Sequence, residues 1–194
     1  MHSNLVKLSR WMAGAGGVDI LVNNAGIQHV APVEAFPVEK WDQIIALNLT
    51  AAFDTSRLAV PHMKAAGWGR IINIASAHGL VGSAQKVAYV AAKHGVLGMT
   101  KVAALETAND GITVNAICPG WVLTPLVQKQ IEAKAAEQGI SIEKATEDLL
   151  IAKQPSKQFA TPEQMGELAA FLSSEAAAQM TGIAIPVDGG WTAQ

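Results

Sequence analysis

Short apolar segments alternate with longer helical segments along this chain, and this alternation limits the fold more than any other feature. Residues 18–23, 70–75 and 112–119 are rich in Val and Ile and end in polar residues or in Gly and Pro. Residues 38–66 and 87–109 lie between them and carry apolar residues at helical spacing. These connections are too long for hairpins, so the strands should run parallel with helical crossovers. The sequence predicts an α/β fold with a doubly wound parallel sheet.

The rest of the chain continues this plan. After Pro119 an irregular, helix-prone insertion extends to about Phe159. Thr161 is then a predicted helix cap, followed by Pro in the first helical position and a helix to about Leu172. A last strand is expected at about residues 182–187. No repeat, low-complexity tract or linker interrupts the chain, so we expect residues 1–194 to form one domain.

Composition excludes several classes of function. Charged residues make up 15% of the chain and the net charge is -2, which predicts no nucleic-acid partner. The single cysteine, Cys118, excludes an internal disulfide and a cysteine-based zinc site. We predict no metal site, core packing for Cys118, and a reducing, cytoplasmic location. No apolar stretch reaches the roughly 20 residues of a membrane span, and no apolar signal-peptide region opens the chain, so no membrane partner is predicted.

Small and polar residues follow each predicted strand at its carboxyl end. The first strand runs into residues 23–26 (Asn-Asn-Ala-Gly), the second into Ser76, and the third into Pro119 and Gly120. Parallel sheets bind their ligands beyond the carboxyl ends of the strands. Small residues at neighbouring strand ends let a flat ligand approach the backbone. The sequence therefore predicts a ligand site at this edge.

Tyr89 and Lys93 are four residues apart on a predicted helix and should share one face, one turn apart. An ordinary exposed pair has the same spacing, but Ser76 ends a strand near the same edge. A reaction that changes the protonation of a substrate oxygen requires a general acid/base within hydrogen-bond reach. Lowering a phenol pKa by about 3 units requires about 4 kcal/mol of stabilisation of the phenolate. An ammonium about 4 Å away, at an effective dielectric of about 20, contributes about that much. We predict Tyr89 as acid/base, Lys93 as its electrostatic partner and Ser76 as a hydrogen-bond partner of the reacting oxygen.

The motifs, in their order, resemble those of the short-chain dehydrogenase/reductase family from Val18 to Trp191. The matching segments are Asn23-Asn24-Ala25-Gly26, Asn48, Ser76, Tyr89-Val90-Ala91-Ala92-Lys93 and Pro119-Gly120. The resemblance implies an oxidoreductase with a Rossmann-like fold, in which Lys93 also binds the nicotinamide ribose. It implies that Asn48 holds a water in the proton relay. A helix kink, or a buried side chain bonded to backbone, is the alternative for Asn48.

The resemblance also implies the cofactor, NAD, and the residues that contact it. They are Asn24, Ala25 and Gly26 on the adenosine side, and Pro119, Gly120, Val122 and Thr124 beside Tyr89 and Lys93 at the nicotinamide end. Folds of this type open with a strand, a glycine-rich turn and a helix that takes the pyrophosphate. The glycine cluster at residues 14–17 precedes a strand instead. We therefore expect a partial domain that lacks the first strands and this turn. Expressed alone, it should bind NAD weakly and be inactive or nearly so.

Several polar residues near the predicted site have no catalytic role, and they indicate which substrate the site binds. One cation with several neutral donors suits a small carboxylate, and tryptophans can close an apolar wall around a short alkyl group. Several segments resemble family members that oxidise D-3-hydroxybutyrate to acetoacetate. The resemblance implies substrate contacts from Gln28, Ser76, His78, Lys86 and Gln130, with Trp121 and Trp191 around the methyl group.

Larger-scale features also follow from the resemblance. The insertion at residues 126–158 should be a lid over a hydroxy acid or keto acid substrate. A homotetramer should form through the two long helices, with Phe53 and Leu97 in the core or the interface. Two alternatives stay open. The pocket could serve another substrate, such as a 3-oxoacyl thioester, or the chain could be a non-catalytic truncated subunit that binds full-length subunits.

Overall fold

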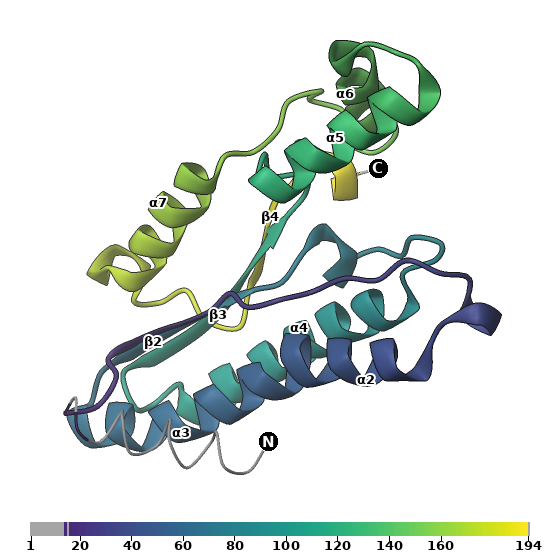
Figure 1. Cartoon of the computed structure of the whole chain (residues 1–194). Helices are drawn as coiled ribbons and strands as arrows, with labels where there is room; N and C mark the ends of the chain where they lie inside the picture. Colours follow the sequence, from purple (N-terminus) through teal and green to yellow (C-terminus); the bar gives the residue numbers. More distant parts are fainter. Residues whose placement is uncertain (1–13, 15, 194) are drawn as a thin grey trace.

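The computed structural model describes residue 14 and residues 16–193, and its framework is a four-stranded parallel sheet (Figure 1). The strands stand in the order β1-β2-β3-β4. Their bounds are β1 (Ile20–Asn23), β2 (Gly69–Ile74), β3 (Ile112–Pro119) and β4 (Ala184–Val187). The predicted parallel sheet is confirmed, and the strand bounds differ from those predicted only at their ends.

Helices connect the strands, as the alternation predicts. The predicted helical segment 38–66 is α2 (Val38–Ile45), a π-helical turn (Ala46–Thr50) and α3 (Ala51–Ala66) in direct succession. The remaining helices are α4 (Val87–Thr107), α5 (Pro125–Gln138), α6 (Ile142–Ile151) and α7 (Pro162–Ser173). Short 3-10 turns lie at Val33–Ala35, Ala77–Gly79, Glu175–Ala177 and Trp191–Ala193. None of the helices in the described part of the chain is long and apolar enough to cross a membrane.

The two faces of the sheet are covered by different helices. Successive strand residues point to opposite faces, so Ile71 and Ile72 on β2 belong to different cores. Ile71 packs with Met63 on α3 and with Ala104 on α4. Ile72 packs with Leu172 on α7. Figure 1 shows α3 and α4 on one side of the sheet and α7 on the other, which confirms the doubly wound arrangement.

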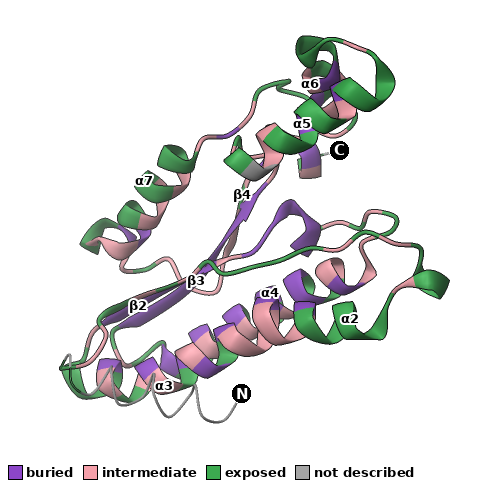
Figure 2. Ribbon diagram, in the orientation of Figure 1, coloured by how far each residue is buried: buried purple, intermediate pink, exposed green. Residues whose placement is uncertain are grey.

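Burial along the sheet is uneven. Figure 2 shows β2 and β3 buried along their length, and all eight residues of β3 are buried, including Cys118. Strand β1 pairs only with β2 within the described residues, and Ile20 and Val22 are 47% and 46% exposed. The predicted core position of Cys118 is confirmed.

The ends of the helices follow local sequence signals. Thr161 caps α7, since its Oγ1 accepts from the N–H of Gln164 at 3.2 Å while its own N–H donates to Gln164 Oε1 at 3.0 Å. Pro162 occupies the first turn, where its missing N–H costs no hydrogen bond. Helix α3 ends at Gly67, which adopts a left-handed φ of 68°. The predicted start of α7 is confirmed.

Helices α5 and α6 form the insertion, and Figure 1 shows them beyond the carboxyl end of the sheet. They pack on each other through Ile131, Ala135 and Ala145. The chain then returns to the sheet, where the N–H of Ala160 donates to the carbonyl of Trp121 at 2.9 Å. The insertion therefore stands beside the predicted ligand edge.

Candidate active site

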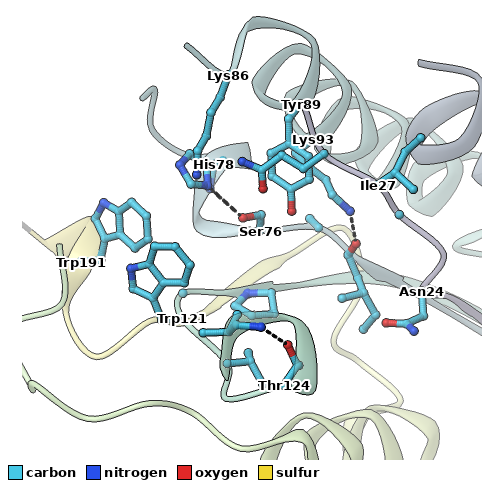
Figure 3. Close-up of a pocket in the computed structure, with 18 residues that line it drawn as sticks. Asn24, Ile27, Ser76, His78, Lys86, Tyr89, Lys93, Trp121, Thr124 and Trp191 are labelled. Carbon is cyan, nitrogen blue, oxygen red and sulfur yellow. Dashed lines mark hydrogen bonds between the residues drawn. The ribbon is translucent and has the colours of Figure 1, made fainter. Parts of the chain in front are cut away.

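The carboxyl ends of the strands surround a cavity of about 290 Å³ (Figure 3). Strand β2 brings Ser76 to it, β3 brings Pro119 and Gly120, and the segment after β1 brings Asn24 and Gly26. Helix α4 contributes Tyr89 and Lys93. The other lining residues are Ile27, Gln28, Ile74, Ala75, His78, Lys86, Trp121, Val122, Thr124, Val127 and Trp191. The predicted ligand edge thus holds a cavity lined by most of the predicted site residues.

Tyr89 and Lys93 lie on the first turns of α4, one turn apart, as their spacing predicts. The Ala-rich face of this helix packs against its neighbours through Ala88 and Ala92, which leaves the two long side chains directed at the cavity. Lys93 is only 4% exposed, and its Nζ donates to the carbonyl of Ile74 at 2.7 Å. The same Nζ lies 5.6 Å from the centroid of the Tyr89 ring. The helix therefore delivers a phenol and an ammonium to one buried place.

Ser76 follows β2 directly and caps the 3-10 turn Ala77–Gly79. Its Oγ accepts from the backbone N–H of His78 at 3.1 Å and lies 3.4 Å from His78 Nδ1. The Ser76 hydroxyl also acts on Tyr89, whose phenol pKa it lowers. Figure 3 shows Ser76 and Tyr89 facing the same space. This pair of hydroxyls can contact one substrate oxygen.

Asn48 is buried in the π-helical turn and binds the backbone of Ile27 in both directions. Its Oδ1 accepts from the Ile27 N–H at 2.9 Å, and its Nδ2 donates to the Ile27 carbonyl at 2.9 Å. Single π turns recur at functional sites because they redirect one side chain from a helix. The structure thus contains the backbone-bonding arrangement that we set out as the alternative for Asn48, and the water-holding role stays a prediction.

The predicted direction of the Tyr89 pKa is wrong for this structure. Burial raises the pKa of the Tyr89 phenol above its ordinary value, and the Ser76 hydroxyl opposes that rise. The ammonium of Lys93 is drawn to the Ile74 carbonyl, and burial lowers the pKa of Lys93 itself to about 8. Desolvation disfavours both charged forms, so the phenol stays protonated near neutral pH.

His78 is packed between two aromatic rings at the cavity wall. Its ring centroid lies 5.8 Å from that of Tyr89 and 5.0 Å from that of Trp191. Its Nε2 lies 2.9 Å from Ser83 Oγ. Burial, and then the charges of Lys86 and Lys153, lower the pKa of His78 to about 4. The imidazole is therefore neutral near pH 7, and both ring nitrogens already have protein neighbours.

Lys86 precedes α4 and reaches the far end of the cavity, with its Nζ 5.6 Å from the centroid of a Trp121 ring. Burial and then the charge of Lys153 lower the pKa of Lys86. Gln85 has a left-handed φ of 65°, and its carbonyl accepts from the Ala31 N–H at 3.0 Å. Backbone held in this region is a feature of ligand sites. This strained turn fixes where Lys86 enters the cavity.

Some other predicted site residues lie elsewhere or have a second role. Gln130 is exposed on α5 and does not line the cavity. Ala25 lines a neighbouring cavity of about 200 Å³ between β1 and α3. Thr124 lines the main cavity but also caps α5, where its Oγ1 accepts from the Val127 N–H at 3.3 Å. The contacts predicted for Gln130 and Ala25 stay predictions.

Sequence reasoning missed two residues beside the cavity, Gln154 and Lys153. Gln154 is buried, and its Oε1 accepts from the Trp121 N–H at 2.9 Å. Lys153 Nζ lies 5.6 Å from the centroid of a Trp191 ring. Both residues follow α6, and each is more than 30 positions from its partner, Trp121 or Trp191, in the sequence. No local motif marks them, so only the packed structure could reveal them.

The residues around Lys93 fit a nicotinamide dinucleotide. An added Cβ at Gly26 would lie 3.6 Å from Asn48 Oδ1 and 3.8 Å from Lys93 Nζ, so a side chain there would fill the space beside the ammonium. Lys93 donates to one carbonyl and has three N–H groups, which leaves donors for ribose hydroxyls. No cluster of metal-ligating side chains occurs in the described ranges.

Comparison with known proteins agrees with this site: the chain belongs to the short-chain dehydrogenase/reductase family of oxidoreductases. A family model described as Enoyl-(Acyl carrier protein) reductase matches residues 7–192. The D-beta-hydroxybutyrate dehydrogenase of Cupriavidus necator is 68% identical over 179 residues, which are 92% of this chain and 69% of the relative. The protein of the same name from Rhizobium meliloti is 59% identical over the same shares of the two chains.

A solved structure shows the same fold with a nicotinamide dinucleotide. It is a putative 2-deoxy-D-gluconate 3-dehydrogenase from Agrobacterium tumefaciens with bound NADP. The match has a TM-score of 0.80 and 39% sequence identity, and it covers 91% of this chain and 68% of the other. The Rossmann-like fold predicted from the sequence is confirmed.

Proposed function

We propose that the native enzyme interconverts D-3-hydroxybutyrate and acetoacetate with NAD as the hydride acceptor and donor. One observation carries the proposal: the cavity that holds Ser76, Tyr89 and Lys93 also holds the cation Lys86 among neutral polar groups. The first group suits oxidation of a carbinol, and the second suits a carboxylate a few bonds away. The two D-beta-hydroxybutyrate dehydrogenases at 68% and 59% identity support this substrate.

The proton is handled by Tyr89 and Ser76. In reduction the neutral Tyr89 phenol would donate its proton to the substrate oxygen. In oxidation the phenol would first lose its proton to water, and the phenolate would then accept the proton of the substrate hydroxyl. Ser76 Oγ holds the reacting oxygen in line with the phenol. Pro119, Gly120, Val122 and Thr124 would hold the nicotinamide, which would supply or accept the hydride. Because burial raises the pKa of Tyr89, the neutral phenol is ready to donate, and oxidation should become faster as pH rises.

Lys93 acts on the proton step through its charge. Its ammonium, 5.6 Å from the Tyr89 ring, favours the phenolate that accepts the substrate proton in oxidation. Its remaining N–H groups would bind the nicotinamide ribose. Asn48 fixes the backbone of Ile27 beside this group and would hold the water that passes the proton on.

The opposite end of the cavity recognises the rest of the substrate. Lys86 would pair with the carboxylate, and Gln28, His78 and Gln130 would add hydrogen bonds. Gln130 must approach from α5 to do so, which fits a lid at residues 126–158 that closes over the substrate and excludes water. Trp121 and Trp191 would enclose the methyl group.

Assembly is the remaining part of the proposal. Helices α3 and α4 carry exposed apolar residues, Phe53 at 50%, Val102 at 54% and Leu105 at 80% exposure. Leu97 packs into the core with Val96 and Ala75 instead. Exposed apolar residues that together form one patch mark protein–protein contacts. We propose a homotetramer through the faces of α3 and α4.

Substrate choice is tested with the native enzyme, produced from its own gene. The kcat/KM for D-3-hydroxybutyrate with NAD should be higher than the kcat/KM for its neutral methyl ester with NAD. It should also be higher than the values for reduction of an acetoacetyl thioester and for D-3-hydroxybutyrate with NADP. Lys86→Ala should raise the KM for the acid by about 10- to 100-fold, since loss of a charged hydrogen bond costs about 1.5–3 kcal/mol. The ester should be little affected. The matched control is Lys101→Ala, an exposed lysine on the same helix.

A parent enzyme that prefers the ester or the thioester would show that this substrate is wrong. Equal losses for acid and ester in Lys86→Ala would contradict the carboxylate contact. If the enzyme works as well with NADP, the choice of NAD is wrong while the chemistry stands.

A further inference from the structure

A second lysine stands at the tryptophan-lined end of the cavity. Lys153 lies in the turn after α6, and its Nζ is 5.6 Å from the centroid of a Trp191 ring. Trp191 packs edge-on against His78 with ring centroids 5.0 Å apart, and both rings line the cavity. Figure 3 shows Trp191 and Lys86 on the same side of the site as His78. Lys153 is therefore one side chain away from the space that the proposed substrate would fill.

The turn that carries Lys153 is tied to the ends of the strands. The neighbouring Gln154 is 1% exposed, and its Oε1 accepts from the Trp121 N–H at 2.9 Å. Ser156 donates from its N–H to the carbonyl of Gly189 at 2.9 Å. These bonds join the turn to the segments after β3 and β4. The position of Lys153 is thus set by the sheet as well as by α6.

The charge of Lys153 reaches into the cavity. Among the described residues neither Lys86 nor Lys153 has a salt-bridge partner. The carboxylate of Asp188, after β4, is occupied by the N–H groups of Gly190 and Thr192 and by the Thr192 hydroxyl. Lys153 lowers the pKa values of both Lys86 and His78. Two positive charges near one neutral imidazole make this end of the cavity attractive to an anion.

We propose that Lys153 is a specificity residue that draws the carboxylate end of the substrate toward Lys86 from behind Trp191. This inference rests on the proposed function and extends it to a residue outside the cavity wall. A cation at the rim of a site changes association and its salt dependence more than it changes the chemical step. Lys153 is thus a positioning residue and takes no part in hydride or proton transfer.

The test is Lys153→Met in the native enzyme, with D-3-hydroxybutyrate and its methyl ester as substrates. For the acid, kcat/KM should fall about three- to tenfold through a higher KM, and its dependence on salt should become shallower. The kcat for the acid and both constants for the ester should stay close to those of the parent. Lys153→Arg keeps the charge and should behave as the parent does. The matched control is Lys157→Met, an exposed lysine of the same turn, which should change neither constant.

Two results would overturn the role of Lys153: an unchanged KM and salt dependence for the acid in Lys153→Met, or equal losses for acid and ester. Failure of the parent to oxidise D-3-hydroxybutyrate would instead overturn the proposed substrate. In that case calorimetric titration with acetate decides the role of Lys153. Weaker acetate binding by Lys153→Met at low salt would support the role, and equal binding would reject it.

Discussion

At the scale of single residues, this site shows that burial can reverse an expectation based on charge. The charge of Lys93 close to Tyr89 suggests a lowered phenol pKa. The phenol pKa is raised instead, because burial excludes water from it. The same exclusion lowers the pKa of Lys93 to about 8. The spacing of the pair could be predicted from the sequence, but the balance between desolvation and charge depends on packing across the chain.

His78 provides a test of this electrostatic description through stability. Its folded pKa of about 4 lies below the ordinary value of 6.5, so the unfolded chain binds a proton that the folded chain does not. The free energy of unfolding should therefore fall as pH falls from about 6.5 to about 4. After allowance for screening by solvent, we expect this histidine to account for about 1–2 kcal/mol of the loss.

Denaturant unfolding at pH 7.5 and pH 4.5 measures this effect. In His78→Gln the free energy of unfolding should fall less between the two pH values than it does in the parent, by the contribution expected for His78. His94→Gln, which removes an exposed histidine of α4, should keep the full fall. An equal fall in His78→Gln and the parent would show that His78 titrates normally when folded.

At the scale of elements, the segment after β3 is packed too tightly for any side chain at Gly120. An added Cβ there would lie 2.7 Å from Gln154 Oε1 and 2.8 Å from the Asp188 Cα. Gly120→Ala should push these neighbours apart and lower the free energy of unfolding by about 1–3 kcal/mol. Activity should fall as well, because the same segment lines the cavity.

Gly98→Ala is the control for Gly120→Ala. Gly98 is exposed on α4 with nothing within 4 Å of an added Cβ, so alanine should be neutral or stabilise by about 0.5–1 kcal/mol. Urea unfolding compares the two variants. A Gly120→Ala protein as stable as the parent would mean that this segment can relax away from Gln154.

Elements were easier to predict than the contacts between them. The strands and helices follow from apolar periodicity, and the cap of α7 follows from Thr161 and Pro162. Gln154 and Lys153 could not be found in this way, because their partners Trp121 and Trp191 are remote in sequence. These contacts form because the chain folds back from the insertion onto the sheet, and no local sequence pattern predicts that packing.

At the scale of the whole molecule, the exposed apolar residues of α4 test the proposed assembly. Leu105 is 80% exposed, and Leu105→Glu should shift the native enzyme from tetramer toward smaller species, since a carboxylate in an apolar contact is costly. Ile151→Glu, on α6, should leave the assembly intact. Sedimentation velocity distinguishes these outcomes. A parent that sediments as a monomer would contradict the tetramer.

The central claim is that Tyr89 moves the proton in a NAD-dependent oxidation of D-3-hydroxybutyrate. Its most direct test is the steady-state formation of NADH by the native enzyme and by Tyr89→Phe, with NAD binding measured alongside. We predict that Tyr89→Phe loses nearly all turnover, by about 100-fold or more, because it removes the phenolic hydroxyl and keeps the ring. NAD binding should stay close to that of the parent. Turnover within about tenfold of the parent, well short of the usual contribution of a general acid/base, would contradict the assignment.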